Sequence, residues 1–324
     1  MIDGFYRAPF WLPGGHVQTI YPAFVSRPSV AYRRQRVDTP DGDFVDFDWL
    51  AGGASADAPL VVLFHGLEGG SGSHYALALM ARLAAIGWRG VVPHFRGCSG
   101  EPNRLARAYH SGDYAEVGWM LETIRAHEPK APMFAAGVSL GGSALLNWLG
   151  REEHRARAIL EAAAAISTPL DLTAAGISIG QGLNRIYSRH FLSTLVPKAI
   201  AMARRFPSAL DAAAIALADS MYRFDETVTA PLHGFAGADD YWRRASSKPW
   251  LKGIAVRTLV LNARNDPFIP AESLPSRSDA SASVTIEQPD GGGHGGFLSP
   301  RFPGGLDWLP RHVVAFFEGR GTRS

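Results

Sequence analysis

A serine, an aspartate and a histidine stand at places in the chain where together they could cleave an acyl bond. Ser139 is the centre of a G-x-S-x-G motif between Gly137 and Gly141, with an apolar run at 133–136 before it and small and apolar residues at 142–149 after it. Strand, G-x-S-x-G and helix form a nucleophile elbow, a sharp turn that exposes the serine hydroxyl above a sheet. A side chain two residues to either side would collide in such a turn, which explains the two glycines. The sequence therefore predicts Ser139 as a nucleophile.

The partners of such a serine are expected after later strands of the same sheet. Asp266 follows the apolar run 257–262, and His294 stands in a glycine-rich loop after the run 284–288. The order Ser, Asp, His along the chain is that of α/β-hydrolase triads. In these roles Ser139 attacks an acyl carbonyl, His294 moves the proton, and Asp266 orients the imidazole and stabilises its protonated form.

The negative charge that develops on the carbonyl oxygen needs two N–H donors. The amide of Leu140, the residue after the nucleophile, is one candidate. The other is the Leu67 amide, in a glycine-rich loop that follows the apolar run 59–64. We interpret His65 and Gly66, which open this loop, as residues that shape it.

Each assignment has a simpler alternative. His294 is one of eleven histidines and could be an ordinary loop residue, while Asp279 and Asp290 compete with Asp266 for the role of the acid. Asp279 has no strand before it, and Asp290 lies too near His294 along the chain, so both are interpreted as turn residues. Cys98 has no evident activating base and is interpreted as a small buried residue.

Composition excludes several other classes of protein. A net charge of +2 without a basic run argues against nucleic-acid binding, and the single cysteine excludes an internal disulfide and a cysteine zinc site. Neither a P-loop, a dinucleotide fingerprint nor a metal-ligand spacing is found. We therefore expect no cofactor and no metal. The absence of a secretory signal and of an apolar membrane span predicts a cytoplasmic protein.

Apolar runs and helical patterns alternate along most of the chain, which indicates an α/β protein with a mostly parallel central sheet and helices on both faces. Strands are expected at 33–37, 44–49, 59–64, 90–95, 133–136, 158–166, 257–262 and 284–288, and helices at 75–86, 113–127, 142–149 and 309–318. The alternation stops at 167–248, where only helical patterns such as 191–205 and 210–222 occur. We expect a single domain, 1–324, with 167–248 as an inserted helical cap. Residues 1–32 are expected to be an irregular arm whose rings are buried or touch a membrane peripherally.

Several motifs beyond the three candidate catalytic positions resemble one branch of the α/β-hydrolases, the YheT-like proteins related to the mammalian ABHD lipases. The motifs are His16-Val17-Gln18-Thr19, Asp41-Gly42-Asp43-Phe44-Val45-Asp46, His65-Gly66-Leu67-Glu68-Gly69, the run from His94 to Asn103, Tyr109-His110-Ser111-Gly112, the G-x-S-x-G-G motif, Thr229-Ala230-Pro231-Leu232-His233-Gly234-Phe235, Asn265-Asp266-Pro267 and Gly293-His294. The resemblance spans nearly the whole chain and implies the α/β-hydrolase fold. It also implies a serine carboxylesterase or lipase with Ser139, Asp266 and His294 as its triad.

Three functions remain open at this point. The first is hydrolysis of a small-molecule carboxylic ester through an acyl-serine intermediate. Apolar residues of the insertion, such as Ile200 and Ile215, favour a short or medium acyl chain or an acylglycerol. The second is transfer of the same acyl group to an alcohol, and the third is ligand binding without catalysis. The sequence does not distinguish the first two, and it leaves the oligomeric state open.

Overall fold

An eight-stranded sheet forms the centre of the computed structural model, which describes residues 6–320. Its strands are β1 (Tyr32–Asp38), β2 (Phe44–Leu50), β3 (Leu60–Phe64), β4 (Arg89–Pro93), β5 (Met133–Val138), β6 (Ala162–Ile166), β7 (Arg257–Leu261) and β8 (Val284–Glu287). They lie in the order β1-β2-β4-β3-β5-β6-β7-β8, and all neighbours from β4 onward are parallel. β1 and β2 are an antiparallel hairpin joined to β4. The expected mostly parallel sheet is confirmed.

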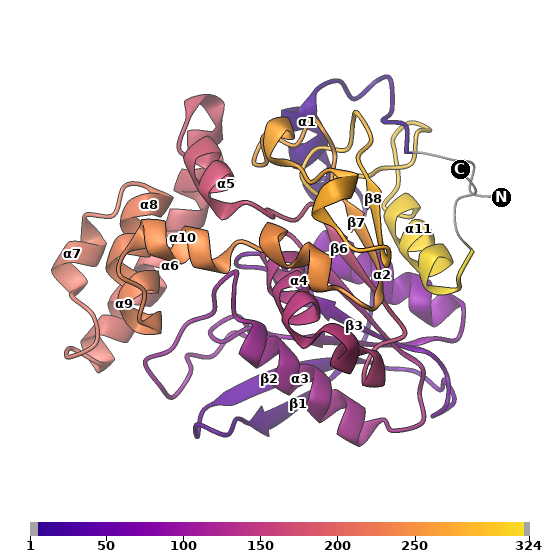
Figure 1. Cartoon of the computed structure of the whole chain (residues 1–324), viewed down its shortest axis with the longest axis horizontal. Helices are drawn as coiled ribbons and strands as arrows, with labels where there is room; N and C mark the ends of the chain where they lie inside the picture. Colours follow the sequence, from indigo (N-terminus) through magenta and orange to yellow (C-terminus); the bar gives the residue numbers. More distant parts are fainter. Residues whose placement is uncertain (1–5, 321–324) are drawn as a thin grey trace.

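Helices cover both faces of the sheet because its central strands are apolar on both sides (Figure 1). α2 (His74–Ala85) and α11 (Trp308–Phe317) pack together on one face, and α3 (Tyr114–His127) and α4 (Leu140–Glu152) pack together on the other. The α2 side chains Leu79, Met80 and Leu83 are buried at helical spacing. This packing holds the carboxyl ends of the parallel strands β5, β7 and β8 at one end of the sheet.

The segment between β6 and β7 contains no strand among its residues, all of which the structure describes, as expected for 167–248. Its helices are α5 (Leu172–Ile179), η3 (Gly182–Asn184), α6 (Arg185–Arg205), α7 (Ala212–Ala216), α8 (Met221–Phe224), the π-helical turn η4 (Asp225–Thr229), α9 (Ala230–His233) and α10 (Ala238–Ala245). Figure 1 shows most of them grouped to one side of the sheet. They bury an apolar cluster of their own that includes Leu192, Ile215 and Phe224. We refer to residues 167–248 as the cap segment.

Two sequence-based expectations need correction. Residues 1–32 are not wholly irregular, because α1 (Gly15–Ile20) and η1 (Tyr21–Ala23) form there. The strand expected from 158 begins only at Ala162, since the short helix η2 (Glu153–Ala158) occupies the first of those positions. The remaining short helices are η5 (Lys248–Gly253), η6 (Ala271–Ser273) and η7 (Arg277–Asp279).

The N-terminal arm buries only some of its aromatic rings. Tyr6 is buried against Phe297 and Trp308, whereas the side chains of Phe10 and Phe24 are 94% and 79% exposed. Phe5 lies outside the described residues. Of the helices described, not one has both the length and the apolar character needed to cross a bilayer.

Candidate active site

Ser139 lies at the turn between β5 and α4, in a backbone conformation that side chains rarely adopt. Its φ is +54°. A Cβ at Gly137 would stand 2.6 Å from the Gly141 carbonyl oxygen, and one at Gly141 would stand 2.5 Å from the carbonyl oxygens of Phe64 and His65. The turn is therefore so tight that neither position can carry a side chain. These close approaches are compatible with the expected elbow.

The structure brings the three predicted side chains into one hydrogen-bonded row. His294 Nε2 lies 2.9 Å from Ser139 Oγ, and His294 Nδ1 lies 2.8 Å from Asp266 Oδ2. A neutral imidazole with its proton on Nδ1 donates to Asp266 and accepts from the Ser139 hydroxyl. The second carboxylate oxygen of Asp266 accepts from the Phe268 amide at 2.8 Å, which fixes the plane of the carboxylate. This is the arrangement in which a histidine can serve as the base for a serine.

The alternative acids lie elsewhere. Asp279 closes a capping box with Ser276 at the start of η7, and Asp290 is exposed. Among the described residues, the one carboxylate recorded in contact with His294 is that of Asp266. Burial raises the pKa of the Cys98 thiol to about 12, so this side chain is a poor thiolate nucleophile.

Helix α1 holds the two loops that carry Asp266 and His294. The buried Gln18 accepts, through Oε1, from Asn265 Nδ2 at 2.9 Å and from the Gly292 amide at 2.7 Å. Thr19 Oγ1 accepts from the His294 amide at 2.9 Å. Sequence reasoning gave the motif around Gln18 no role, because its partners lie more than 240 positions away along the chain.

The two predicted oxyanion donors border the same cavity as the serine. Leu67 and Leu140 line it together with Ser139 and His294. Within residues 6–320, no hydrogen bond uses the amide N–H of either leucine. Both amides are thus available to a substrate oxygen, one of them at the N-terminus of α4, where the helix dipole also favours negative charge.

His65 fixes the loop that carries Leu67. Its Nδ1 lies 2.8 Å from the Gly66 carbonyl oxygen, and its Nε2 accepts from the Phe95 amide at 3.1 Å. Complete burial lowers the pKa of His65 to about 3, so the ring is neutral and its two nitrogens keep these opposite roles. Gly66 donates its amide to the Tyr75 hydroxyl at 2.8 Å. The interpretation of His65 and Gly66 as shaping residues agrees with these contacts.

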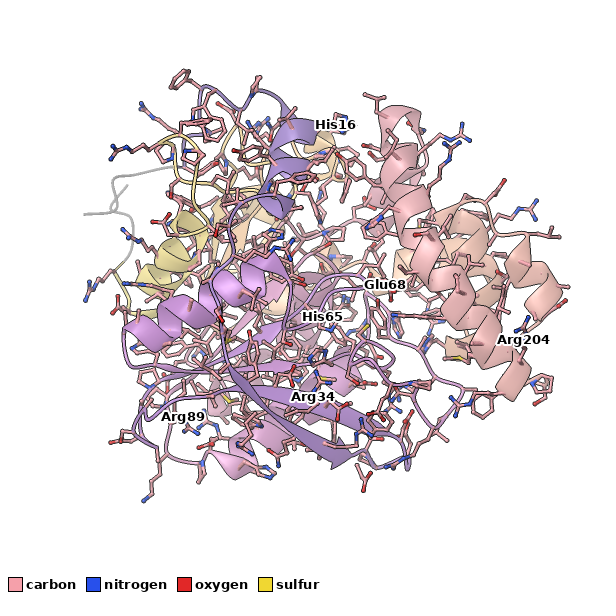
Figure 2. The ribbon with its side chains drawn as sticks, turned by 180° about the vertical axis from the view of Figure 1, so that it is seen from behind. His16, Arg34, His65, Glu68, Arg89 and Arg204 are labelled. Carbon is pink, nitrogen blue, oxygen red and sulfur yellow. The ribbon has the colours of Figure 1, made fainter. Side chains whose placement is uncertain are left out.

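The cap segment is tied to the loops around the site. Lys198 Nζ on α6 lies 2.8 Å from Glu68 Oε2, next to Leu67. His16 Nδ1 on α1 lies 3.1 Å from the Tyr187 hydroxyl of α6, with the two rings stacked. In Figure 2, His16 lies at the end of α1 that faces the cap segment, and Glu68 lies between the core and the cap segment.

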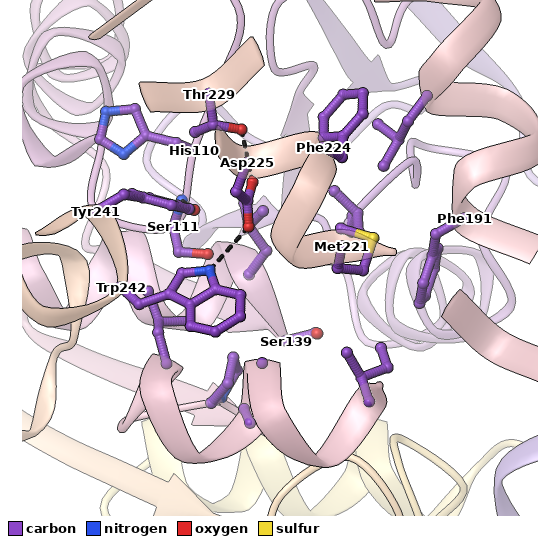
Figure 3. A pocket seen from close by; sticks show the side chains of 18 of the residues that line it. His110, Ser111, Ser139, Phe191, Met221, Phe224, Asp225, Thr229, Tyr241 and Trp242 are labelled. Carbon is purple, nitrogen blue, oxygen red and sulfur yellow. Dashed lines mark hydrogen bonds between the residues drawn. The ribbon is translucent and has the colours of Figure 1, made fainter. Parts of the chain in front are cut away.

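The cavity above Ser139 has a volume of about 170 Å³ and lies between the core and the cap segment. Its walls are mostly apolar and include Leu172, Ile179, Phe191, Leu195, Met221 and Phe268. Figure 3 shows Ser139 at one side of it and Asp225, Thr229 and Trp242 at the other. Across residues 6–320, no group of three or more His, Cys, Asp or Glu side chains has a geometry that could hold a metal ion.

Comparison with known proteins identifies the family of the chain. The model of the α/β-hydrolase fold family matches residues 59–300. The chain belongs to this family. It is 37% identical over 316 residues to YheT of Escherichia coli (strain K12), which carries a provisional esterase name, and the match covers 93% of this chain and 91% of YheT. It is 30% identical over 322 residues to the human phospholipase ABHD3, covering 97% of this chain and 78% of that protein.

These identities confirm the resemblance to the YheT-like branch of the α/β-hydrolases. A solved structure of the Pyrococcus furiosus esterase Pf2001 superposes with a TM-score of 0.57 at 14% sequence identity, covering 99% of this chain and all of that one. The likeness to Pf2001 shows the shared fold.

Proposed function

We propose that this chain is a serine hydrolase that cleaves carboxylic esters through an acyl-Ser139 intermediate. One observation carries the proposal. Ser139, His294 and Asp266 are joined by hydrogen bonds of 2.9 and 2.8 Å, and Ser139 and His294 line an apolar cavity. The provisional esterase name of YheT and the phospholipase name of ABHD3 support the same class of reaction.

The proposed reaction follows from the positions of the donors and acceptors. His294 Nε2 takes the hydroxyl proton as Ser139 Oγ bonds to the ester carbonyl carbon, and the carbonyl oxygen accepts from the amides of Leu67 and Leu140. When the carbon–oxygen bond to the alcohol breaks, His294 gives that proton to the leaving alcohol. Water then repeats both steps on the acyl-enzyme and releases the acid. Asp266 holds the imidazole in the required tautomer throughout.

The substrate that fits the cavity is a small-molecule ester with a short or medium acyl chain, or an acylglycerol. The volume of about 170 Å³ is small, and its lining is mostly apolar. The cap segment forms one wall of the cavity, and we propose that it acts as the lid of a single hydrolase domain. The exposed Phe10 and Phe24 support peripheral contact with a lipid surface as part of the proposal.

A second candidate uses the same intermediate. If an alcohol rather than water attacks the acyl-Ser139, the product is a new ester and the chain is an acyltransferase. A binding protein without catalysis is the less favoured reading, since binding alone gives no reason for the strained backbone of Ser139.

The test combines a fluorophosphonate probe with p-nitrophenyl esters of increasing chain length. We expect labelling at Ser139, located by mass spectrometry, and loss of both labelling and turnover in Ser139→Ala. Ser143→Ala, four residues further along α4, is the matched control and should keep both. Added ethanol should yield ethyl esters if acyl transfer competes with hydrolysis. A Ser139→Ala variant with full turnover would overturn the proposal.

A further inference from the structure

Asp225 is a buried carboxylate in the wall of the cavity, opposite the proposed nucleophile. Its side chain belongs to the π-helical turn η4 and is only 7% exposed. Figure 3 shows its carboxylate between Thr229 and Trp242, with one oxygen hydrogen-bonded to each. π-helical turns are rare and often occur at functional sites. Neither the proposed triad nor the oxyanion hole uses this residue.

The neighbours of Asp225 do not neutralise its charge. Oδ1 accepts from the Thr229 hydroxyl at 2.6 Å, and Oδ2 accepts from Trp242 Nε1 at 2.8 Å. Both donors are neutral, and no Lys, Arg or His within residues 6–320 forms an ion pair with this carboxylate. A carboxylate has about four acceptor positions, and these two hydrogen bonds fill only two of them.

A buried charge without a counter-charge is costly, so its presence calls for an explanation. Burial raises the pKa of Asp225 to about 6, so the carboxyl group is ionised at pH 8. A merely structural link between η4 and α10 would need only a neutral acceptor for the Trp242 N–H. The ionised group instead suits a ligand that brings the missing positive charge.

The walls beside Asp225 are aromatic. Phe224, Tyr241 and Trp242 line the same cavity. Aromatic faces attract cations, and they do so more strongly when water is excluded. A carboxylate with free acceptor positions among aromatic rings is therefore complementary to an organic cation rather than to a neutral hydroxyl group.

We propose that Asp225 binds an alkylammonium group of the substrate, so that the preferred ester carries a positive charge in the part that reaches the cap segment. The inference rests on the proposed function in one respect only, namely that the ligand is an ester substrate. The cation site itself stands on the geometry of the cavity. It gives the apolar pocket a specificity-determining residue on the wall opposite the serine.

The experiment measures binding without any reaction. Isothermal titration calorimetry at pH 8 compares hexylammonium with hexanol, which has the same chain length and can donate a hydrogen bond but carries no charge. We expect the wild-type chain to bind hexylammonium at least ~10-fold more tightly than hexanol. Asp225→Asn should remove this preference and leave the affinity for hexanol within about twofold. Asp239→Asn, which changes an exposed carboxylate of α10, is the matched control and should behave like the wild type.

Each other outcome overturns the cation site. Equal affinity of the wild type for the two ligands would refute the site, even if Asp225→Asn fails to fold. The absence of measurable binding of either ligand to the wild type would also refute it. An equal loss of affinity for both ligands in Asp225→Asn would indicate that the site recognises a hydroxyl group instead. Binding of hexylammonium requires no reaction at Ser139. The Ser139→Ala variant should therefore bind it as the wild type does. Fluorophosphonate labelling without a preference for hexylammonium would refute only this inference, and a preference without labelling would refute only the proposed esterase function.

Discussion

The core side and the cap side of the cavity are built by different forces. On the core side, His294 and the loops beside it are fixed by directional hydrogen bonds that they donate to Asp266, Gln18 and Thr19. On the cap side, most wall residues, such as Leu195 and Phe224, are held by apolar packing. Hydrogen-bonded groups keep a defined geometry, whereas an apolar wall accepts changes of shape at modest cost. The core side therefore suits the chemistry, and the cap side suits the choice of substrate.

Buried charges show the same contrast. In the core, the buried Arg96 lies between Asp43, at 3.0 Å, and Glu116, at 2.9 Å, so that each of these three charges has a partner. On the cap side, Asp225 has only neutral donors. A buried ion pair is explained by its structural role. An unpaired buried carboxylate in a cavity wall is instead a candidate for ligand binding.

The largest effect is expected on the core side, from Asp266→Asn. The amide can still accept from the Phe268 backbone, so the fold should persist, but it no longer selects the tautomer of His294. We expect kcat for a p-nitrophenyl ester to fall by ~10³–10⁴. Asp279→Asn is the matched control because that carboxylate caps a distant short helix. A loss of less than tenfold in Asp266→Asn would contradict the role of the acid.

A smaller effect is expected from Gln18→Ala, which leaves Asp266 and His294 intact but frees their loops. The change removes the acceptor of two N–H groups, and unpaired buried donors cost ~1–3 kcal/mol each. We expect kcat to fall roughly 10- to 100-fold, with little change in KM, because the cavity walls are untouched. Gln181→Ala, an exposed position of the cap segment, should change neither parameter. A rise in KM without a fall in kcat would place Gln18 in substrate binding instead.

Local signals explain which parts of this site could be predicted from the sequence. Ser139, Asp266 and His294 each stand beside an apolar strand pattern, and the glycines of the elbow mark a tight turn. Gln18 carries no such signal, because its role depends on contacts across 247 and 274 positions of the chain. Asp225 lies in a helical stretch where a charged residue normally faces water, and it is buried because η4 packs against neighbouring helices such as α10.

On the cap side, Phe191→Ala should change the substrate preference rather than the chemistry. Phe191 lines the cavity and packs near Phe268, whose ring contacts His294. Removing the ring makes room for further methylene groups, each worth about 0.8 kcal/mol when buried. We expect the optimum of kcat/KM to move to p-nitrophenyl esters longer by two or more carbons. An unchanged chain-length profile would show that the acyl chain does not reach this wall.

The smallest effect concerns the junction between the two sides, where His233 of the cap segment packs against His110 of the core at a ring-centroid distance of 4.4 Å. Burial first, and the neighbouring His110 second, lower the pKa of His233 to about 3. Between pH 6.5 and 3 the unfolded chain therefore binds a proton that the folded chain does not, so this residue lowers the free energy of unfolding as the pH falls.

His233→Phe removes that proton-linked loss. Between pH 7.5 and pH 5, the free energy of unfolding of the variant should rise relative to that of the wild type by up to about 1–2 kcal/mol. Urea unfolding at each pH measures this difference. His127→Phe, at an exposed position of α3, is the matched control and should give a difference that stays constant with pH. The raised pKa of Asp225 acts with the opposite sign, but it is common to both proteins and cancels from the comparison. Parallel pH curves for His233→Phe and the wild type would mean that this junction opens to water before the rest of the chain unfolds.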